Sequence, residues 1–242
     1  MGKVRAPIDP VADLRRRLTR VGPASVAKIR SCVQRWWSDH GLETHPATVG
    51  KRIAIVLIEQ RSAAHKLAGT VVLERLGEQL RATDVPAFAR LFGGGHLAAF
   101  DIVDRFATCV LATLLDREPC QADAARAIAS WRSAESGWQR RAACVAFTRL
   151  AANGDTAVPG LTSMILGVCA TVVWSPARCD QTAVGWVLRE LARAEPDRVE
   201  TFFVRHARFM SRECAKLVVA KLPPDQRREL LARHTRATTL RR

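Results

Sequence analysis

The sequence contains no tyrosine and shows little strict alternation of apolar and polar residues. Alternating aromatic and β-branched residues are the usual signs of β-strands, so a fold rich in strands is excluded. Alanine, leucine, arginine and glutamate dominate instead, and these residues favour helices. With 242 residues, 48% of them hydrophobic, the chain can build the core of one helical domain. We therefore predict an all-α protein.

Signals for export and for membrane insertion are also lacking. The first thirty residues contain three prolines and no apolar segment of the kind found in signal peptides. The longest apolar run, residues 164–174, is too short to span a bilayer. We expect a soluble, cytoplasmic protein that has no membrane partner.

The motifs of common cofactor and metal sites are absent from the sequence. None of the seven cysteines forms a CxxC pair or a zinc-finger spacing with histidine, so we expect reduced, packed thiols and no metal. The chain has no nucleotide-binding glycine loop, no HExxH and no GxSxG. The glycines at 93–95 follow no strand signal and are interpreted as a linker. No cofactor is expected.

The chain has few acidic residues relative to basic ones. Lysine and arginine number 38 against 23 aspartates and glutamates, a net charge of +15. Such an excess predicts a polyanionic partner, with nucleic acid first and an anionic membrane second. Both ends of the chain are basic, at residues 15–20 and 226–242.

Prolines and glycines divide the chain into segments of helix length. The expected helices lie near residues 10–20, 24–39, 46–61, 63–81, 86–92, 97–115, 119–132, 136–153, 157–173, 177–194, 196–206, 210–221 and 224–234. Many similar helices with short connections are typical of a bundle or of an α-solenoid, whose concave face is the usual binding surface. We expect one domain over 1–242, with a basic N-terminal arm and first helix at 1–23 and a frayed basic tail at 235–242.

The helix expected over 97–115 places a carboxylate at the margin of its apolar stripe. Asp104 lies one helical turn after Phe100, at spacing i, i+4. One interpretation is structural: Asp104 caps a neighbouring helix or pairs with an arginine such as Arg141. The other is functional: the carboxylate lies in a cleft, where it stabilises positive charge or positions a water.

The helix expected over 136–153 has an arginine on a mostly apolar face. Arg141 shares that face with Trp138, while Arg140 points elsewhere. Because an unpaired buried guanidinium is costly, Arg141 needs an anionic partner. The sequence leaves two partners open, a nearby carboxylate in a structural ion pair or a phosphate.

The helix expected over 177–194 carries a tryptophan opposite its apolar stripe. Trp186, Arg189 and Arg193 follow spacings of three and seven on that side. The tryptophan either packs against a neighbouring helix or lines a surface that meets phosphates and bases, since arginine binds phosphate and an indole face attracts cations.

Four segments in this order resemble the AlkD-type DNA alkylation-repair family. They are FDIVD (100–104), GWQRRAACVAF (137–147), AVGWVLRELARAEPDRVETFF (183–203) and MSRECAK (210–216). The resemblance covers roughly residues 30–220. It implies an α-solenoid of HEAT-like antiparallel helix pairs with a concave basic face. It also implies a monofunctional DNA glycosylase that excises N3- and N7-alkylated purines from duplex DNA without a cofactor.

The resemblance also implies roles for individual residues. Asp104 matches the catalytic aspartate, and Arg141 matches an arginine that holds the DNA backbone near the lesion. Trp186 matches one of two tryptophans in the active cleft, and Phe100 stands in the place of the other. From their spacing beside Trp186, and not from the resemblance, Arg189 and Arg193 are assigned to backbone binding with Arg141. We expect a monomer at the nucleoid.

Three functions remain open at this point. The first is the glycosylase, with bulky adducts among its substrates because Phe100 leaves more room than an indole. The second is a non-catalytic HEAT-like repeat protein that binds damaged or branched DNA. The third is a protein-binding scaffold whose charge is incidental. A steep dependence of DNA affinity on salt would separate the first two from the third.

Overall fold

The computed structural model describes residues 9–21, 25–116, 121–156 and 158–239, and within them all regular structure is helical. The first helices are α1 (Pro10–Val21), α2 (Val26–Asp39), α3 (Ala47–Ile58), α4 (Ala63–Arg75), α5 (Val85–Gly93), α6 (Phe100–Phe106) and α7 (Ala112–Leu115). The later ones are α8 (Gln121–Ser130), α9 (Gly137–Val145), α10 (Thr148–Ala151), α11 (Leu161–Val172), α12 (Arg178–Leu191), α13 (Pro196–His206), α14 (Arg212–Val218) and α15 (Pro224–Thr239). The predicted all-α fold is confirmed.

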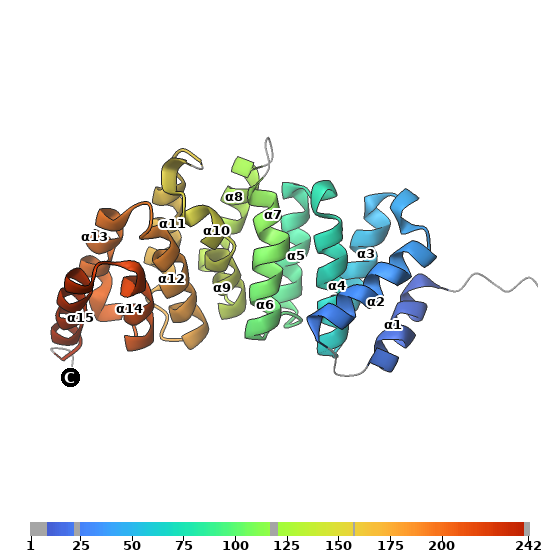
Figure 1. The fold of residues 1–242 in the computed structure, drawn as a ribbon, viewed down its shortest axis with the longest axis horizontal. Coiled ribbons are helices and arrows are strands. Elements are labelled where there is room, and N and C mark those ends of the chain that lie inside the picture. The colour runs from blue at the N-terminus through green and yellow to red at the C-terminus, as the bar shows by residue number, and fades with distance from the viewer. Residues whose placement is uncertain (1–8, 22–24, 117–120, 157, 240–242) are drawn as a thin grey trace, which may run out of the picture.

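The helices stand side by side in chain order, from α1 at one end of the molecule to α15 at the other (Figure 1). One continuous layer consists of α2, α4, α6, α9, α12 and α14, each of which packs against the next. Helices α1, α3, α11 and α13 pack on α2, α4, α12 and α14, respectively. This arrangement is compatible with the predicted solenoid, and it places α6, α9 and α12, which carry the candidate site, next to one another.

Two of the expected helices are interrupted. The segment expected over 97–115 begins only at Phe100, and a π-helical turn, η4 (Ala107–Leu111), separates α6 from α7. The segment expected over 136–153 divides into α9 and α10. Neither break contains a proline or a glycine, so the local sequence carried no signal for them. Conversely, α15 continues to Thr239, so the basic tail is helical beyond the predicted end at 234.

A single apolar core runs along the layer. Its largest fully buried side chains are aromatic and include Trp36, Phe88, Phe106, Phe147 and Phe203. The six cysteines in the described segments are free thiols, and Cys120 lies outside them. In the part of the chain described here, no helix is both long and apolar enough to cross a membrane.

Candidate functional site

Asp104 lies on α6 with its carboxylate held by Arg141 of α9. Arg141 donates from Nε to Asp104 Oδ1 at 2.6 Å and from Nη2 to Oδ2 at 2.7 Å. Two parallel, charge-assisted bonds of this kind fix both the position and the plane of a carboxylate. The side chain of Asp104 nevertheless keeps 25% of its surface exposed, so the ion pair is buried on the Arg141 side only.

Arg141 is buried behind Asp104. Only 4% of the residue is exposed, and its Nη1 donates to the carbonyl of Cys179 at 2.9 Å and to the hydroxyl of Thr182 at 2.8 Å. The guanidinium therefore ties α6 and α9 to the first turns of α12. The Asp104–Arg141 ion pair, one of the arrangements expected from the sequence, is present. The role in holding the DNA backbone stays a prediction, and it has no support from this geometry because the contacts of Arg141 are to protein groups.

The neighbouring arginine is also bound within the protein. Arg140 Nη2 donates to Asp180 Oδ2 at 2.6 Å, and its Nη1 donates to two backbone carbonyls in the connection before α9. Asp180 is completely buried. Two ion pairs, Arg140–Asp180 and Arg141–Asp104, thus fasten α9 to its neighbours on both sides.

Phe100 lies on the opposite side of Asp104 from the pocket described next. Its ring packs edge-on against Trp138 with centroids 5.0 Å apart, and the guanidinium carbon of Arg141 lies 4.6 Å from its centroid. Arg178 approaches the same ring at 5.4 Å. Phe100 is 36% exposed. The ring lies against the guanidinium groups of both Arg141 and Arg178.

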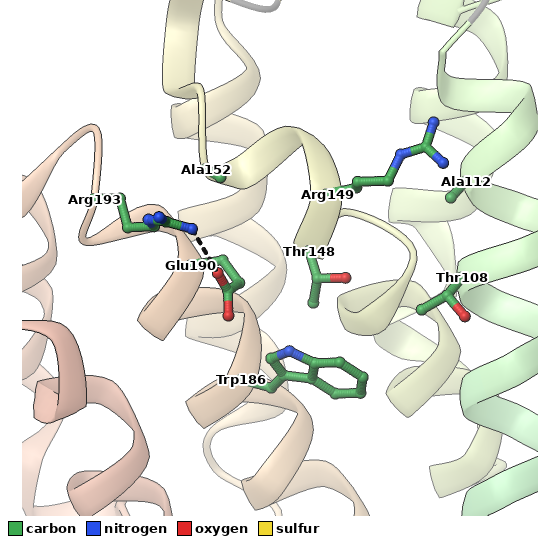
Figure 2. A pocket seen from close by; sticks show the side chains of 8 residues that line it. All are labelled: Thr108, Ala112, Thr148, Arg149, Ala152, Trp186, Glu190 and Arg193. Carbon is green, nitrogen blue, oxygen red and sulfur yellow. Dashed lines mark ion pairs between the residues drawn. The ribbon is translucent and has the colours of Figure 1, made fainter.

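A pocket of about 300 Å³ opens one helical turn from Asp104 on the other side. It is lined by Thr108, Ala112, Thr148, Arg149, Ala152, Trp186, Glu190 and Arg193. Figure 2 shows the indole of Trp186 facing the middle of this space, between α12 and the helix that carries Thr108. The pocket is therefore lined by residues of the α6–α7 segment, of α10 with the residue that follows it, and of α12.

The π-helical turn links Asp104 to the pocket. The hydroxyl of Thr108 donates to the backbone carbonyl of Asp104 at 2.7 Å, which satisfies an acceptor next to the irregular turn. Such turns recur at functional sites because the extra residue redirects the side chains that follow. Here the turn brings Thr108 into the pocket with Trp186, while Asp104 stays against Arg141.

The charges around the pocket have both signs. Glu190 is paired with Arg189 at 2.9 Å, with Lys221, and with Arg193 at 3.9 Å. Burial by itself would raise the pKa of Glu190, but the hydrogen bonds from Lys221 and Arg189 outweigh it and lower that pKa below its ordinary value. The pocket thus presents a carboxylate that is ionised at neutral pH.

The predicted basic residues differ in what they can offer to DNA. Arg193 lines the pocket with 60% of its side chain exposed, whereas Arg189 is turned to Glu190 and does not line it. Arg149 is equally open, with 67% of its side chain exposed, and its guanidinium also pairs with Asp116. Neither Arg149 nor Glu190 was predicted from the sequence. Glu190 lies within the quoted third segment, but its spacing alone assigned it no role.

The fold and the site define an all-α protein built from a row of packed helices. It carries a buried arginine–carboxylate pair and a nearby pocket lined by tryptophan and arginine. Comparison with known families specifies the class further, because the family described as DNA alkylation repair enzyme matches residues 23–218. This match spans most of the chain, so the chain belongs to the DNA alkylation repair enzyme family. Among curated proteins, no sequence matches the chain.

Proposed function

We propose that the protein is a monofunctional DNA glycosylase that hydrolyses the N-glycosidic bond of cationic N3- and N7-alkylated purines in duplex DNA. The observation that supports this most is the placement of Asp104. Its carboxylate is oriented by two bonds from Arg141, its side chain is partly exposed, and Thr108, one turn further along the chain, lines a pocket that contains Trp186. The proposed setting is a monomer that acts on duplex DNA at the nucleoid, without a cofactor.

The chemistry requires little beyond such a carboxylate. An alkylated purine already carries positive charge, so the bond from C1′ to the purine nitrogen can break without a general acid, and the base leaves neutral. Positive charge then develops on the sugar, and the anionic Asp104 stabilises it. A water adds its oxygen to C1′ and releases a proton, which completes the hydrolysis.

In this proposal the pocket binds the cationic base and the DNA phosphates that flank it. The indole of Trp186 favours a cationic base by cation–π attraction, and Glu190 holds the arginines beside it in place. The exposed guanidinium groups of Arg149 and Arg193 suit the phosphates that flank the lesion.

Bulky adducts are included in the proposed substrate range. The pocket of about 300 Å³ beside Trp186 supports this part; Phe100 does not line it, so its smaller ring adds no room there. Release of 3-methyladenine without release of any bulky N3 or N7 purine adduct would contradict this part of the proposal and leave the glycosylase activity intact.

A non-catalytic DNA-binding protein is the second candidate, favoured by one observation. Both carboxylate oxygens of Asp104 accept bonds from Arg141, the arrangement that a purely structural ion pair also adopts. The two functions predict opposite results for base release.

The deciding experiment measures release of bases from methylated genomic DNA by the wild-type protein and by Asp104→Asn. Glycosylase activity predicts release by the wild type and its loss in Asp104→Asn, with DNA affinity retained. Asp101→Asn is the matched control, since Asp101 is an exposed carboxylate on the same helix, and it should behave as the wild type. DNA binding by the wild type without any base release would favour the non-catalytic function.

A further inference from the structure

An exposed aromatic stack lies at the connections that precede α12 and α14. Trp174, directly after α11, is 59% exposed. Its ring stacks on Phe209 with centroids 3.7 Å apart and planes tilted by 35°. The guanidinium carbon of Arg208 lies 4.6 Å from the Phe209 ring. We call these three side chains the Trp174 stack; none of them lines the pocket around Trp186.

A buried glutamine holds this stack in place. Gln181 is 2% exposed, and its Nε2 donates to the carbonyls of Val173 at 2.8 Å, Ser175 at 2.8 Å and Phe209 at 3.1 Å. Its Oε1 accepts from the backbone nitrogen of Ser211 at 2.8 Å. One side chain therefore fixes both connections. A large indole that is exposed to solvent but fixed by a buried, hydrogen-bonded side chain is typical of a preformed binding surface.

The charge around the stack points to an anionic partner. Arg205, Arg208 and Arg212 are exposed, and within the described segments none of them forms an ion pair with a carboxylate. About half of the exposed arginines elsewhere in the described segments have such a partner, as Arg178 does with Glu213 at 2.7 Å. Three guanidinium groups without a carboxylate partner, all within four residues of Phe209 in the chain, suit phosphates next to a planar, apolar ligand.

The connection that carries Trp174 leads into α12, whose first residue contacts the candidate site. Arg178, four residues after Trp174, lies over the ring of Phe100 and pairs with Glu213 at the start of α14. The same edge of the molecule therefore carries Phe100, next to Asp104, and the Trp174 stack. A DNA strand that reaches Asp104 can continue along this edge.

From these observations we infer that the Trp174 stack binds an unpaired nucleobase of the DNA, with the neighbouring arginines on its phosphates. Stacking of a base on an aromatic ring needs no particular sequence, because every base has a planar face. A base inside an intact duplex has no free face, so the surface selects DNA with an unpaired nucleotide close to the duplex that the candidate site contacts. The inference rests on the proposed function only for its choice of DNA as partner.

The test compares a labelled blunt duplex with the same duplex carrying a five-nucleotide single-stranded extension, using fluorescence anisotropy on the full chain. We expect the wild type to bind the extended duplex roughly tenfold more tightly than the blunt one. Trp174→Ala should lose this preference and bind the blunt duplex unchanged, while Trp174→Phe should retain part of it. Val204→Ala is the control, since Val204 is an exposed apolar residue on α13 with no ring to stack.

Two results would overturn the inference. One is an equal preference for the extended duplex in the wild type and Trp174→Ala. The other is a change in sedimentation of Trp174→Ala with no change in DNA binding, which would make the stack a contact between copies of the chain. Base release from methylated DNA, measured on the same samples, keeps the proposals separate. Its absence in the wild type refutes the glycosylase, and its presence together with an unchanged preference in Trp174→Ala refutes only the role of the stack.

Discussion

The replacement Arg141→Ala removes the group that binds Asp104 to α9 and α12. Arg141 is 4% exposed and makes four hydrogen bonds to protein groups, two of them to the carboxylate. Loss of one partner of a buried ion pair costs about 3–5 kcal/mol. Because the Asp104 side chain is 25% exposed and can be hydrated, we take the lower end, about 3 kcal/mol. For a chain of this length the melting temperature should fall by roughly 6–12 °C.

Two measurements on the same variants locate the function of Arg141. Thermal unfolding gives the stability. The slope of the logarithm of DNA affinity against the logarithm of salt concentration gives the number of phosphates contacted, because each contact makes the slope more negative by about 0.9. If Arg141 positions Asp104, Arg141→Ala loses stability and base release but keeps the salt slope. The matched variant is Arg193→Ala, which removes an exposed guanidinium at the pocket. It should keep the stability and reduce the slope by about one contact.

The opposite pattern would refute this reasoning. A loss below about 1 kcal/mol in Arg141→Ala would show that the guanidinium is not buried against Asp104 in solution. A reduced salt slope in that variant would indicate that Arg141 contacts a DNA phosphate, the role that the family resemblance implies. Arg141→Lys adds a further check, since lysine keeps the charge but cannot make two parallel bonds to a carboxylate, so base release should still fall.

Three further predictions follow from the same packing. Trp186→Ala should reduce release of cationic bases more than it reduces DNA affinity, measured as base release against anisotropy, because the indole faces the pocket; equal losses in both would contradict this. Glu190→Gln should cost about 1 kcal/mol at pH 7. Because the pKa of Glu190 is lowered, its contribution to the free energy of unfolding is present above its ordinary pKa of 4.5 and is lost as the pH falls through the lowered value. Urea unfolding should therefore find the wild type and the variant equally stable in acid. A stability difference that grows in acid would show that the pKa is raised instead. Gly185→Ala should destabilise the protein by about 1–3 kcal/mol, because its added carbon would lie 2.8 Å from Cβ of Leu217. Gly167→Ala on α11 meets no atom within 4 Å and should be neutral or stabilising.

The helices could be predicted because their signals are local. The period of apolar residues and the positions of prolines and glycines correctly located α1, α2 and α13, almost to the residue. The breaks at η4 and between α9 and α10 could not be predicted from the sequence, since neither contains a helix-breaking residue. They arise where packing against neighbouring helices outweighs local helix propensity, a term that no short window of sequence contains.

The candidate site was predictable in part. The order of the four segments identified Asp104, Arg141 and Trp186, and the structure places all three on α6, α9 and α12, which pack in succession. It separates Phe100 from the pocket and turns Arg189 to Glu190. Both differences depend on contacts between residues that are distant in the chain or on the rotamer of a long side chain, and helical spacing specifies neither.

The sequence by itself determined an all-α protein of strong positive charge, and the order of its motifs indicated the family. Those properties depend on composition, on local periodicity and on chain order, all of which the letters contain. Only the tertiary structure decided which anion Arg141 binds, that Glu190 is held ionised at the pocket, and that Trp174 stands exposed on Phe209. Each depends on at least one partner thirty or more residues away, which is Lys221 for Glu190, so it exists only after the helices have packed.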